Sequence, residues 1–357
     1  MVQVYNVSTE AVHSVDITQQ NTVSKERAAC PQNSEVEKIA ISADGQNMAT
    51  VDCLWSDLSR ILLKFWSWSE DIVNYTLNTQ VEFPHQSGVQ SICFQPNTGH
   101  RSQVRPMLLT VGCDDKAKVW RLGSNNWSCE SCISYKQLKT RAGDWSSDGS
   151  MIGLGCGHVL TLWSSADTRM KASLSLENRE EITNVVFGRG PFSRHVYTTT
   201  SQSFISWDLV TMSAVWSLSL QFSPHTSIVL SPSSPLMSII QKNSISIINQ
   251  DTKTVETLSN MNCTGGGAWQ GEDLFYLDYD GSLSRLSRRH QTTVNNTSVI
   301  TSSTTTSSWL LNTRLNKQSE KVAPMTRART MHDIDSLLAL PLHTLPPPSQ
   351  LSQSFIR

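Results

Sequence analysis

The chain has 357 residues, of which 38% are hydrophobic and 17% charged, and its formal net charge is −1. This length accommodates one large domain or two small ones, and the near-neutral charge gives no overall bias toward polyanions. No apolar run approaches the roughly 20 residues that span a bilayer, and the N-terminus lacks the pattern of a secretion signal. We therefore expect no membrane partner.

The eight cysteines do not predict a metal site. Only Cys129 and Cys132 lie close together, in CESC, and no second pair stands at the spacing of a four-ligand zinc site. Others lie in apolar runs such as VQSICF and IGLGCG. We expect ordinary buried or half-exposed reduced thiols.

The first strand candidates, VQVYNV and AVHSVDI, lie within residues 1–34. From about residue 35 the chain repeats short strand candidates separated by turn residues, beginning with EKIAIS, MATVDCLW, ILLKFWSW and YTLNTQV. A tryptophan closes a similar run in four successive repeats, at Trp66, Trp120, Trp163 and Trp207, which gives intervals of 54, 43 and 44 residues. The inserted PNTGHRSQVRP accounts for the longer first interval. Such spacing is typical of propeller blades.

The fifth repeat, from SIVLSP to TVETL, lacks the tryptophan, and the sixth consists of GGAWQ, DLFYLDYDG and LSRLS. We therefore predict an all-β propeller of seven blades, six of them clear and four-stranded between about residues 35 and 290. The N-terminal strands are expected to complete the seventh blade with residues after 290. Closure of this kind leaves no free sheet edge.

The turn in LLTVGCDDKAKVW contains Asp114 and Asp115, which suggest either a reactive carboxylate site or a structural turn. The stretch resembles the WD-repeat family, in which a His, a Ser or Thr, a turn Asp and a Trp form one hydrogen-bonded set. The resemblance assigns these roles to His85, Thr110, Asp114 or Asp115, and Trp120. A carboxylate accepts hydrogen bonds from an imidazole, and an indole donates to a hydroxyl. We favour the structural interpretation over catalysis.

The other repeats depart from the family pattern. Gly157 and Ser201 stand where the turn Asp is expected. Trp163 and Trp207 remain, and Trp207-Asp208 keeps the dipeptide that names the family. The resemblance therefore implies a propeller with degenerate blades.

Nothing in the chain predicts an active site. GLGCG at 153–157 lies between strands with no following helix, so it lacks the anion-binding dipole of a phosphate loop. GGG at 265–267 indicates a loop or bulge, and Asp278 and Asp280 indicate a hairpin turn. The nine histidines form no i, i+4 pair. We expect a protein that is not an enzyme, with no cofactor, no metal and no small-molecule substrate.

The C-terminal part has a different composition. Residues 291–308 form a Ser/Thr-rich linker, and residues 309–357 form a basic, then apolar and Pro-rich tail. Residues 282–330 contain eight basic residues and one acid, which suggests a contact for nucleic acid or an acidic protein; the alternative is a solvated tail. The candidate contact residues are Arg285, Arg288, Arg289, Arg314, Lys317, Lys321, Arg327 and Arg329.

A closer resemblance covers most of the chain and is best in residues 60–210. LKFWSW, YTLNTQVEFPHQSGVQSICF, the LLTVGCDDKAKVW blade and IDSLLALPLHTLPPP are similar to a family of two-propeller WD-repeat subunits of the small-subunit processome. This chain corresponds to the second propeller and the tail of that family, so we expect a fragment, a truncated gene model or a reduced form.

The resemblance implies a nucleolar scaffold in ribosome biogenesis. Such a subunit assembles the processome on nascent precursor ribosomal RNA, supports processing of that RNA and promotes transcription by RNA polymerase I. The implied partners are other WD-repeat processome subunits and precursor ribosomal RNA. The alternative is a WD-repeat adaptor without RNA contact, such as a ubiquitin-ligase substrate receptor or a trafficking scaffold. The basic tail favours the processome scaffold, whereas the near-neutral total charge of the chain does not.

Overall fold

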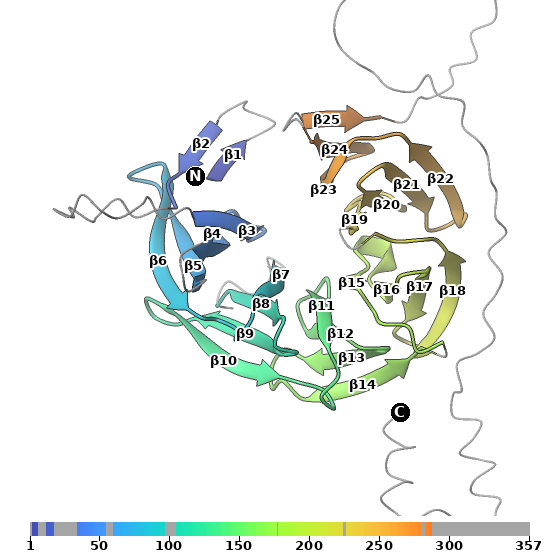
Figure 1. The fold of residues 1–357 in the computed structure, drawn as a ribbon, viewed down its shortest axis with the longest axis horizontal. Helices are drawn as coiled ribbons and strands as arrows, with labels where there is room; N and C mark the ends of the chain where they lie inside the picture. The colour runs from blue at the N-terminus through green and yellow to red at the C-terminus, as the bar shows by residue number, and fades with distance from the viewer. Residues whose placement is uncertain are drawn as a thin grey trace, which may run out of the picture. The chain divides into compact units, whose positions relative to one another are not determined.

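The computed structural model describes residues 2–5, 12–17, 34–54, 60–96, 105–176, 178–223, 226–279 and 283–287. These residues form 25 strands and one short 3-10 helix, and the strands pair into seven sheets (Figure 1). They group into two compact units, which divide along the chain between Phe187 and Gly188.

The first compact unit contains a two-stranded hairpin and the first three of the sheets that we call blades 1–6. The hairpin pairs β1 (Val2–Tyr5) with β2 (Val12–Val15). Blade 1 consists of β3 (Ser34–Ile41), β4 (Asn47–Leu54), β5 (Arg60–Ser69) and β6 (Asn74–Glu82). Blade 2 consists of β7 (Val89–Phe94), β8 (Met107–Gly112), β9 (Ala117–Leu122) and β10 (Trp127–Ile133). Blade 3 consists of β11 (Thr140–Trp145), β12 (Met151–Cys156), β13 (Val159–Ser164) and β14 (Met170–Ser175).

The remaining strands run from β15 (Asn184–Phe187), the last strand of the first compact unit, to β25. The strand order of blade 4 is β15, β16 (His195–Thr199), β17 (Ser203–Asp208) and β18 (Ser213–Ser219), with the 3-10 helix η1 (Gly190–Phe192) between β15 and β16. Blade 5 consists of β19 (Ser227–Leu230), β20 (Leu236–Gln241), β21 (Ser244–Asn249) and β22 (Thr254–Ser259). Blade 6 consists of β23 (Cys263–Gln270), β24 (Asp273–Asp278) and β25 (Leu283–Leu286).

The predicted all-β fold and its six blades are confirmed. Blades 1–5 have four strands, whereas blade 6 has three within the described residues, and a fourth strand there would lie outside them. The GGG segment lies in β23, where the strand register shifts, as expected for a bulge. The hairpin β1–β2 forms its own sheet. Its predicted completion by residues after 290 lies outside the described residues.

Alternation of buried and exposed side chains accounts for most of the strands, and strands that are buried on both faces have the most apolar sequences. Every residue of β8 is buried, as expected for a strand covered on both sides. The outer strand β10 begins at Trp127, four residues before the predicted SCISY segment. Trp127 is buried and stacks on Phe65 of blade 1, with ring centroids 4.5 Å apart. This contact holds blades 1 and 2 together and extends the strand toward its N-terminal end.

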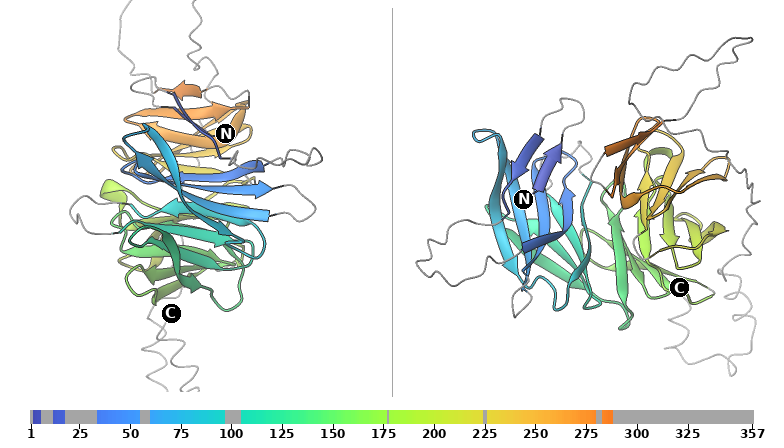
Figure 2. Two further views of the ribbon diagram at one scale, coloured as in Figure 1. Left: turned by 90° about the vertical axis from the view of Figure 1, so that its left-hand side faces the viewer. Right: turned by 45° about the horizontal axis from the view of Figure 1, so that its top comes forward.

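The N-terminal hairpin packs on blade 1 (Figures 1 and 2). Val15 and Ile17 are buried in one cluster with Met48, Trp66 and Tyr75 of blade 1. The hairpin thus covers apolar side chains that β4, β5 and β6 would otherwise expose to water. Such burial contributes about 25 cal/mol to the free energy of unfolding for each Å² of apolar surface.

A buried ion pair lies beneath this hairpin. The Nζ atom of Lys64 lies 2.7 Å from Oδ2 of Asp52 and donates a hydrogen bond of 2.7 Å to the carbonyl oxygen of Ile17. Both charged side chains are buried. Burial raises the pKa of Asp52, and the hydrogen bond and positive charge of Lys64 oppose that rise. The two charges are therefore acceptable in the blade only as a pair.

We expect Asp52→Ala to lower the free energy of unfolding by about 3–5 kcal/mol, because the Lys64 ammonium stays buried without its counter-ion. The double variant Asp52→Leu/Lys64→Met removes both charges at similar volume and should recover a large part of this loss. Urea denaturation of the parent, single and double variants measures the difference. An Asp52→Ala chain as stable as the parent would contradict the buried pair.

Candidate functional site

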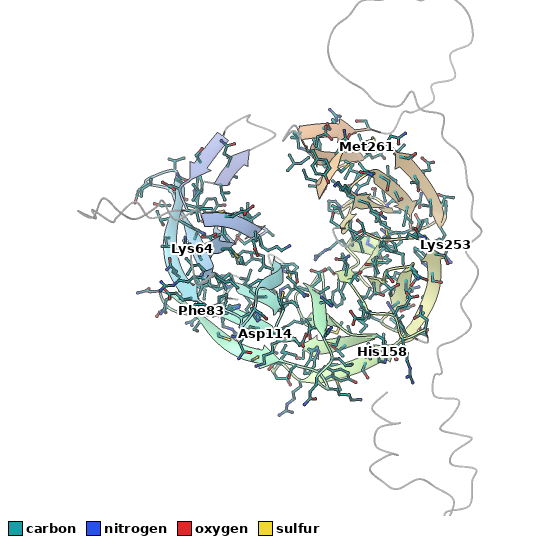
Figure 3. The ribbon with its side chains drawn as sticks, in the orientation of Figure 1. Lys64, Phe83, Asp114, His158, Lys253 and Met261 are labelled. Carbon is teal, nitrogen blue, oxygen red and sulfur yellow. The ribbon has the colours of Figure 1, made fainter. Side chains whose placement is uncertain are left out.

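Blade 2 brings together four of the predicted site residues. His85 precedes β7, Thr110 lies on β8, Asp114 in the β8–β9 turn, labelled in Figure 3, and Trp120 on β9. Nδ1 of His85 lies 2.8 Å from Oδ1 of Asp114, and Nε2 lies 2.8 Å from the Thr110 hydroxyl. The Trp120 indole N–H donates to the same hydroxyl at 2.9 Å. The four groups form one continuous hydrogen-bonded chain.

The direction of these hydrogen bonds fixes the imidazole as a neutral tautomer. An ionised carboxylate can only accept, so Nδ1 of His85 carries a proton and donates to Asp114. In the neutral ring Nε2 is then the acceptor, and the Thr110 hydroxyl, which itself accepts from Trp120, donates to it. Burial lowers the pKa of His85 below its ordinary value of 6.5, against the effect of Asp114. The ring is neutral at neutral pH.

Besides the bond from His85, Asp114 accepts hydrogen bonds from backbone N–H groups. That of Gln86 lies 3.2 Å from Oδ2, and Lys116 supplies another. Burial raises the pKa of Asp114, but the hydrogen bonds from Gln86 and His85 outweigh that effect and hold its pKa below the ordinary value of 3.8. The carboxylate is thus charged and committed to holding the loop before β7 against the β8–β9 turn.

Gly112, which sequence reasoning missed, makes room for this arrangement. A Cβ atom there would lie 2.1 Å from Nδ1 of His85 and 2.3 Å from Oδ1 of Asp114. Any other residue would push the imidazole or the carboxylate away. A glycine at the end of an otherwise apolar strand, just before the two aspartates, is the signal in the sequence.

Asp115 has a different role from Asp114 in the β8–β9 turn. It takes a left-handed backbone conformation, with φ of 60°, which aspartate tolerates better than most residues. Its carbonyl oxygen accepts a hydrogen bond from Thr140 of blade 3. Within the described ranges its carboxylate makes no hydrogen bond or ion pair. The structure therefore places Asp114 alone in the set.

Blades 1 and 4 keep part of the set. Trp66 donates its indole N–H to Thr50 at 3.1 Å, and Trp207 donates to Thr198 at 2.9 Å. Asp208 follows Trp207 and is buried, with Arg194 at 3.6 Å and the backbone N–H of Val210 donating to its carboxylate. Asp208 therefore shapes the β17–β18 turn of its own blade.

Blade 3 replaces the cross-strand hydroxyl. Leu154 occupies the position that Thr110 has in blade 2, two residues after the residue opposite the tryptophan. Trp163 instead donates at 2.9 Å to Thr161 on its own strand. Gly157, in the β12–β13 turn, has φ of 56°, and Ser201 lies in the β16–β17 turn.

The described residues do not assemble a metal site. Nowhere among them do three or more His, Cys, Asp or Glu side chains gather closely enough to hold an ion. Their seven cysteines are free; Cys129 and Cys132 are exposed, and Cys30 lies outside the described residues. No helix in the described part of the chain is long and apolar enough to cross a membrane.

One residue of the predicted basic contact lies within the described part of the chain. Arg285 is on β25, where its guanidinium forms an ion pair with Asp273 and lies 5.8 Å from the Phe275 ring centroid. Part of its charge is therefore neutralised within blade 6. The other seven lie outside the described residues, namely Arg288, Arg289, Arg314, Lys317, Lys321, Arg327 and Arg329.

Repeated antiparallel blades, tryptophans bonded to buried hydroxyls and one His–Asp–Thr–Trp set define a WD-repeat β-propeller protein. Proteins of this class are typically non-catalytic scaffolds. Residues 1–254 match the family model described as the second β-propeller of WD repeat-containing protein 75, and the chain belongs to that family.

Relatives from several vertebrates carry the name WD repeat-containing protein 75. The Danio rerio protein is 31% identical over 222 residues, which cover 59% of this chain and 26% of the relative. The Xenopus laevis protein is 27% identical over 219 residues, covering 57% and 26%, and the Homo sapiens protein is 23% identical over 224 residues, covering 60% and 26%. The matched part of this chain thus spans about a quarter of the length of these relatives.

A chain in the crystal structure of the mitotic checkpoint complex has a similar fold. The TM-score is 0.58 at 14% identity, and the match covers 79% of this chain and 80% of that one. At this identity the likeness concerns the fold alone.

We expect Asp114→Ala to lower the free energy of unfolding by about 1–3 kcal/mol, because the N–H groups of His85 and Gln86 lose their acceptor. Asp115→Asn is the matched control, since asparagine also tolerates the left-handed conformation, and should change stability by less than about 0.5 kcal/mol. Urea denaturation compares the two. The reverse order of effects would place Asp115 in the set instead.

Acid should weaken blade 2. Below its ordinary pKa of 6.5 an unfolded histidine binds a proton, whereas folded His85 resists protonation because its pKa is lowered, so stability falls as the pH falls. Below 3.8 the lowered pKa of Asp114 adds a second loss of the same sign. Stability measured from about pH 7 to about pH 5.5 should decrease less in His85→Gln than in the parent. His158→Gln, a change in the β12–β13 turn, is the control, and equal slopes for all three chains would contradict the prediction.

Proposed function

We propose that this chain is a scaffold subunit in ribosome biogenesis that helps to assemble the small-subunit processome on nascent precursor ribosomal RNA. The observation that carries the proposal is the match of residues 1–254 to the second-propeller family of WD repeat-containing protein 75. The resemblance to processome subunits implies support of precursor processing, promotion of transcription by RNA polymerase I and a nucleolar location.

The geometry of blade 2 supports a scaffolding role. Asp114 holds the loop before β7 through both His85 and Gln86, so this loop is fixed in position. Phe83, two residues before His85, has 53% of its surface exposed (Figure 3). An exposed aromatic side chain on a fixed loop suits contact with another protein, because little entropy is lost on binding. Other WD-repeat processome subunits are the partners we propose.

The basic residues beyond blade 6 support contact with RNA. Residues 286–330 contain seven basic residues and one acid, Glu320, so this segment opposes the charge of a phosphate backbone. Arg285 contributes less, since it pairs with Asp273. We propose that precursor ribosomal RNA is contacted through phosphates, without reading of base sequence.

Reversal of four charges tests this proposal. In Arg288→Glu/Arg289→Glu/Arg327→Glu/Arg329→Glu we expect crosslinking to precursor ribosomal RNA in cells to fall several-fold, because fewer phosphates are neutralised. The melting temperature of the propeller should stay nearly unchanged, since Arg285 is kept. A charge-matched control reverses four exposed propeller cations, Lys136, Arg169, Lys171 and Arg179.

Co-purification in the same cells separates the outcomes. Processome subunits should be recovered equally with the parent and with the tail variant, because the proposed protein contacts come from the propeller. Equal RNA yield from parent and tail variant would discard direct RNA contact by the tail. Recovery of neither processome subunits nor precursor RNA with the parent chain would favour the alternative, a WD-repeat adaptor without RNA.

A further inference from the structure

A pocket of about 200 Å³ lies in the second compact unit, where blade 4 meets the β21–β22 turn of blade 5. Strand register builds one wall. Tyr197 on β16, Ser206 on β17 and Trp216 on β18 are direct partners across the sheet, so their side chains share one face. Gln250 and Lys253 of the β21–β22 turn form the opposite side, and Lys253 is labelled in Figure 3.

One buried polar atom of this pocket, Oγ of Ser206, has no hydrogen-bond partner among the described residues. Only 1% of the surface of Ser206 is exposed. The Tyr197 hydroxyl, in contrast, is satisfied, since it donates to Oε1 of Gln250. Buried polar groups are rarely left unpaired, because each such group costs about 1–3 kcal/mol. A ligand atom in the pocket would supply a partner that the blade does not.

His195, which also lines the pocket, is uncharged. Nε of Arg194 donates to Nε2 of His195 at 3.3 Å, so Nε2 is the acceptor nitrogen and Nδ1 carries the proton. Burial lowers the pKa of His195, and the charges of Arg194 and Lys253 act in the same direction, whereas Asp208 opposes them. The ring is thus neutral, and a hydrogen bond with the backbone of Trp207 engages it within the blade.

The charges around the pocket favour an anion. Lys253 makes no ion pair within the described ranges, and Arg194 is 63% exposed and reaches Asp208 only at 3.6 Å. The pocket is also lined by Phe192 and Trp216, which offer ring surface to an aliphatic stem. Its volume corresponds to about seven water molecules, or one amino-acid side chain.

We propose that this pocket binds an anionic side chain of a partner polypeptide. Lys253 and Arg194 oppose the charge, Ser206 donates a hydrogen bond, and Trp216 contacts the stem of the side chain. Two cations, one shared with Asp208, are too few for a nucleic-acid surface, where six to ten phosphate contacts are typical. None of the residues that line the pocket belongs to the proposed RNA contact, so the two proposals can be tested separately.

Side-chain analogues test the site on the full chain. Phenyl phosphate stands for a phosphorylated residue, phenylacetate for a carboxylate, and phenylacetamide is the neutral control. Binding is followed by NMR through the indole signal of Trp216 and the ring signals of His195. We expect saturable shifts with one or both anions and at least about tenfold weaker binding of the amide, because charged hydrogen bonds contribute more than neutral ones. The anion that binds more tightly shows whether the partner's side chain carries a phosphate or a carboxylate.

Matched variants assign the binding to the pocket. Lys253→Asn, which keeps a residue suited to φ of 54°, and Ser206→Ala should each weaken the anion markedly. Lys242→Asn, which lies outside the pocket lining, should leave the affinity unchanged. Equal binding of the amide, no loss in Lys253→Asn, or no shift with any probe would overturn the proposal. Shifts at Trp216 with a ten-nucleotide oligouridylate but none with the anions would show a nucleic-acid surface instead.

Discussion

The bond from a tryptophan N–H to a buried hydroxyl is the interaction on which blades 1, 2 and 4 depend. Trp66, Trp120 and Trp207 each donate across to a threonine of the neighbouring strand, at 2.9–3.1 Å. A buried indole without an acceptor costs about 1–3 kcal/mol, and the threonine hydroxyl removes that cost in these three blades. Blade 3 differs, because Leu154 stands at the position that the threonine has in those blades. Trp163 there donates to Thr161 on its own strand.

Blade 2 adds to this bond a path from the core to the surface. The hydroxyl of Thr110 joins the buried indole to the imidazole of His85, and Asp114 continues the chain to the backbone of Gln86. Gly112 makes the path sterically possible. The position of the loop before β7 is thereby determined by the core of the blade.

The spacing of tryptophans predicted blades 1–4, and the continued pattern of short strands and turns predicted blades 5 and 6, because each repeat builds one sheet. The pairing of residues between strands could not be predicted from the sequence, because it depends on strand register. Lys64 in ILLKFW, for example, gains its partner Asp52 only through the register of β4 and β5. The choice between Asp114 and Asp115 also depends on the backbone, because the left-handed turn at Asp115 directs its neighbour toward His85. The residues that line the pocket come from several separate strands and turns, so no sequence motif predicts it.

The hydrogen bond from Lys64 to Ile17 has a consequence for the order of folding. Its partners are 47 residues apart, whereas neighbouring strands of a blade pair over short hairpins. Closing a loop of that length costs entropy that grows only slowly with length, but the contact forms late compared with local hairpins. The core of blade 1 is therefore complete only when the segment that contains Ile17 packs against it, and we expect this step to follow formation of the local hairpins.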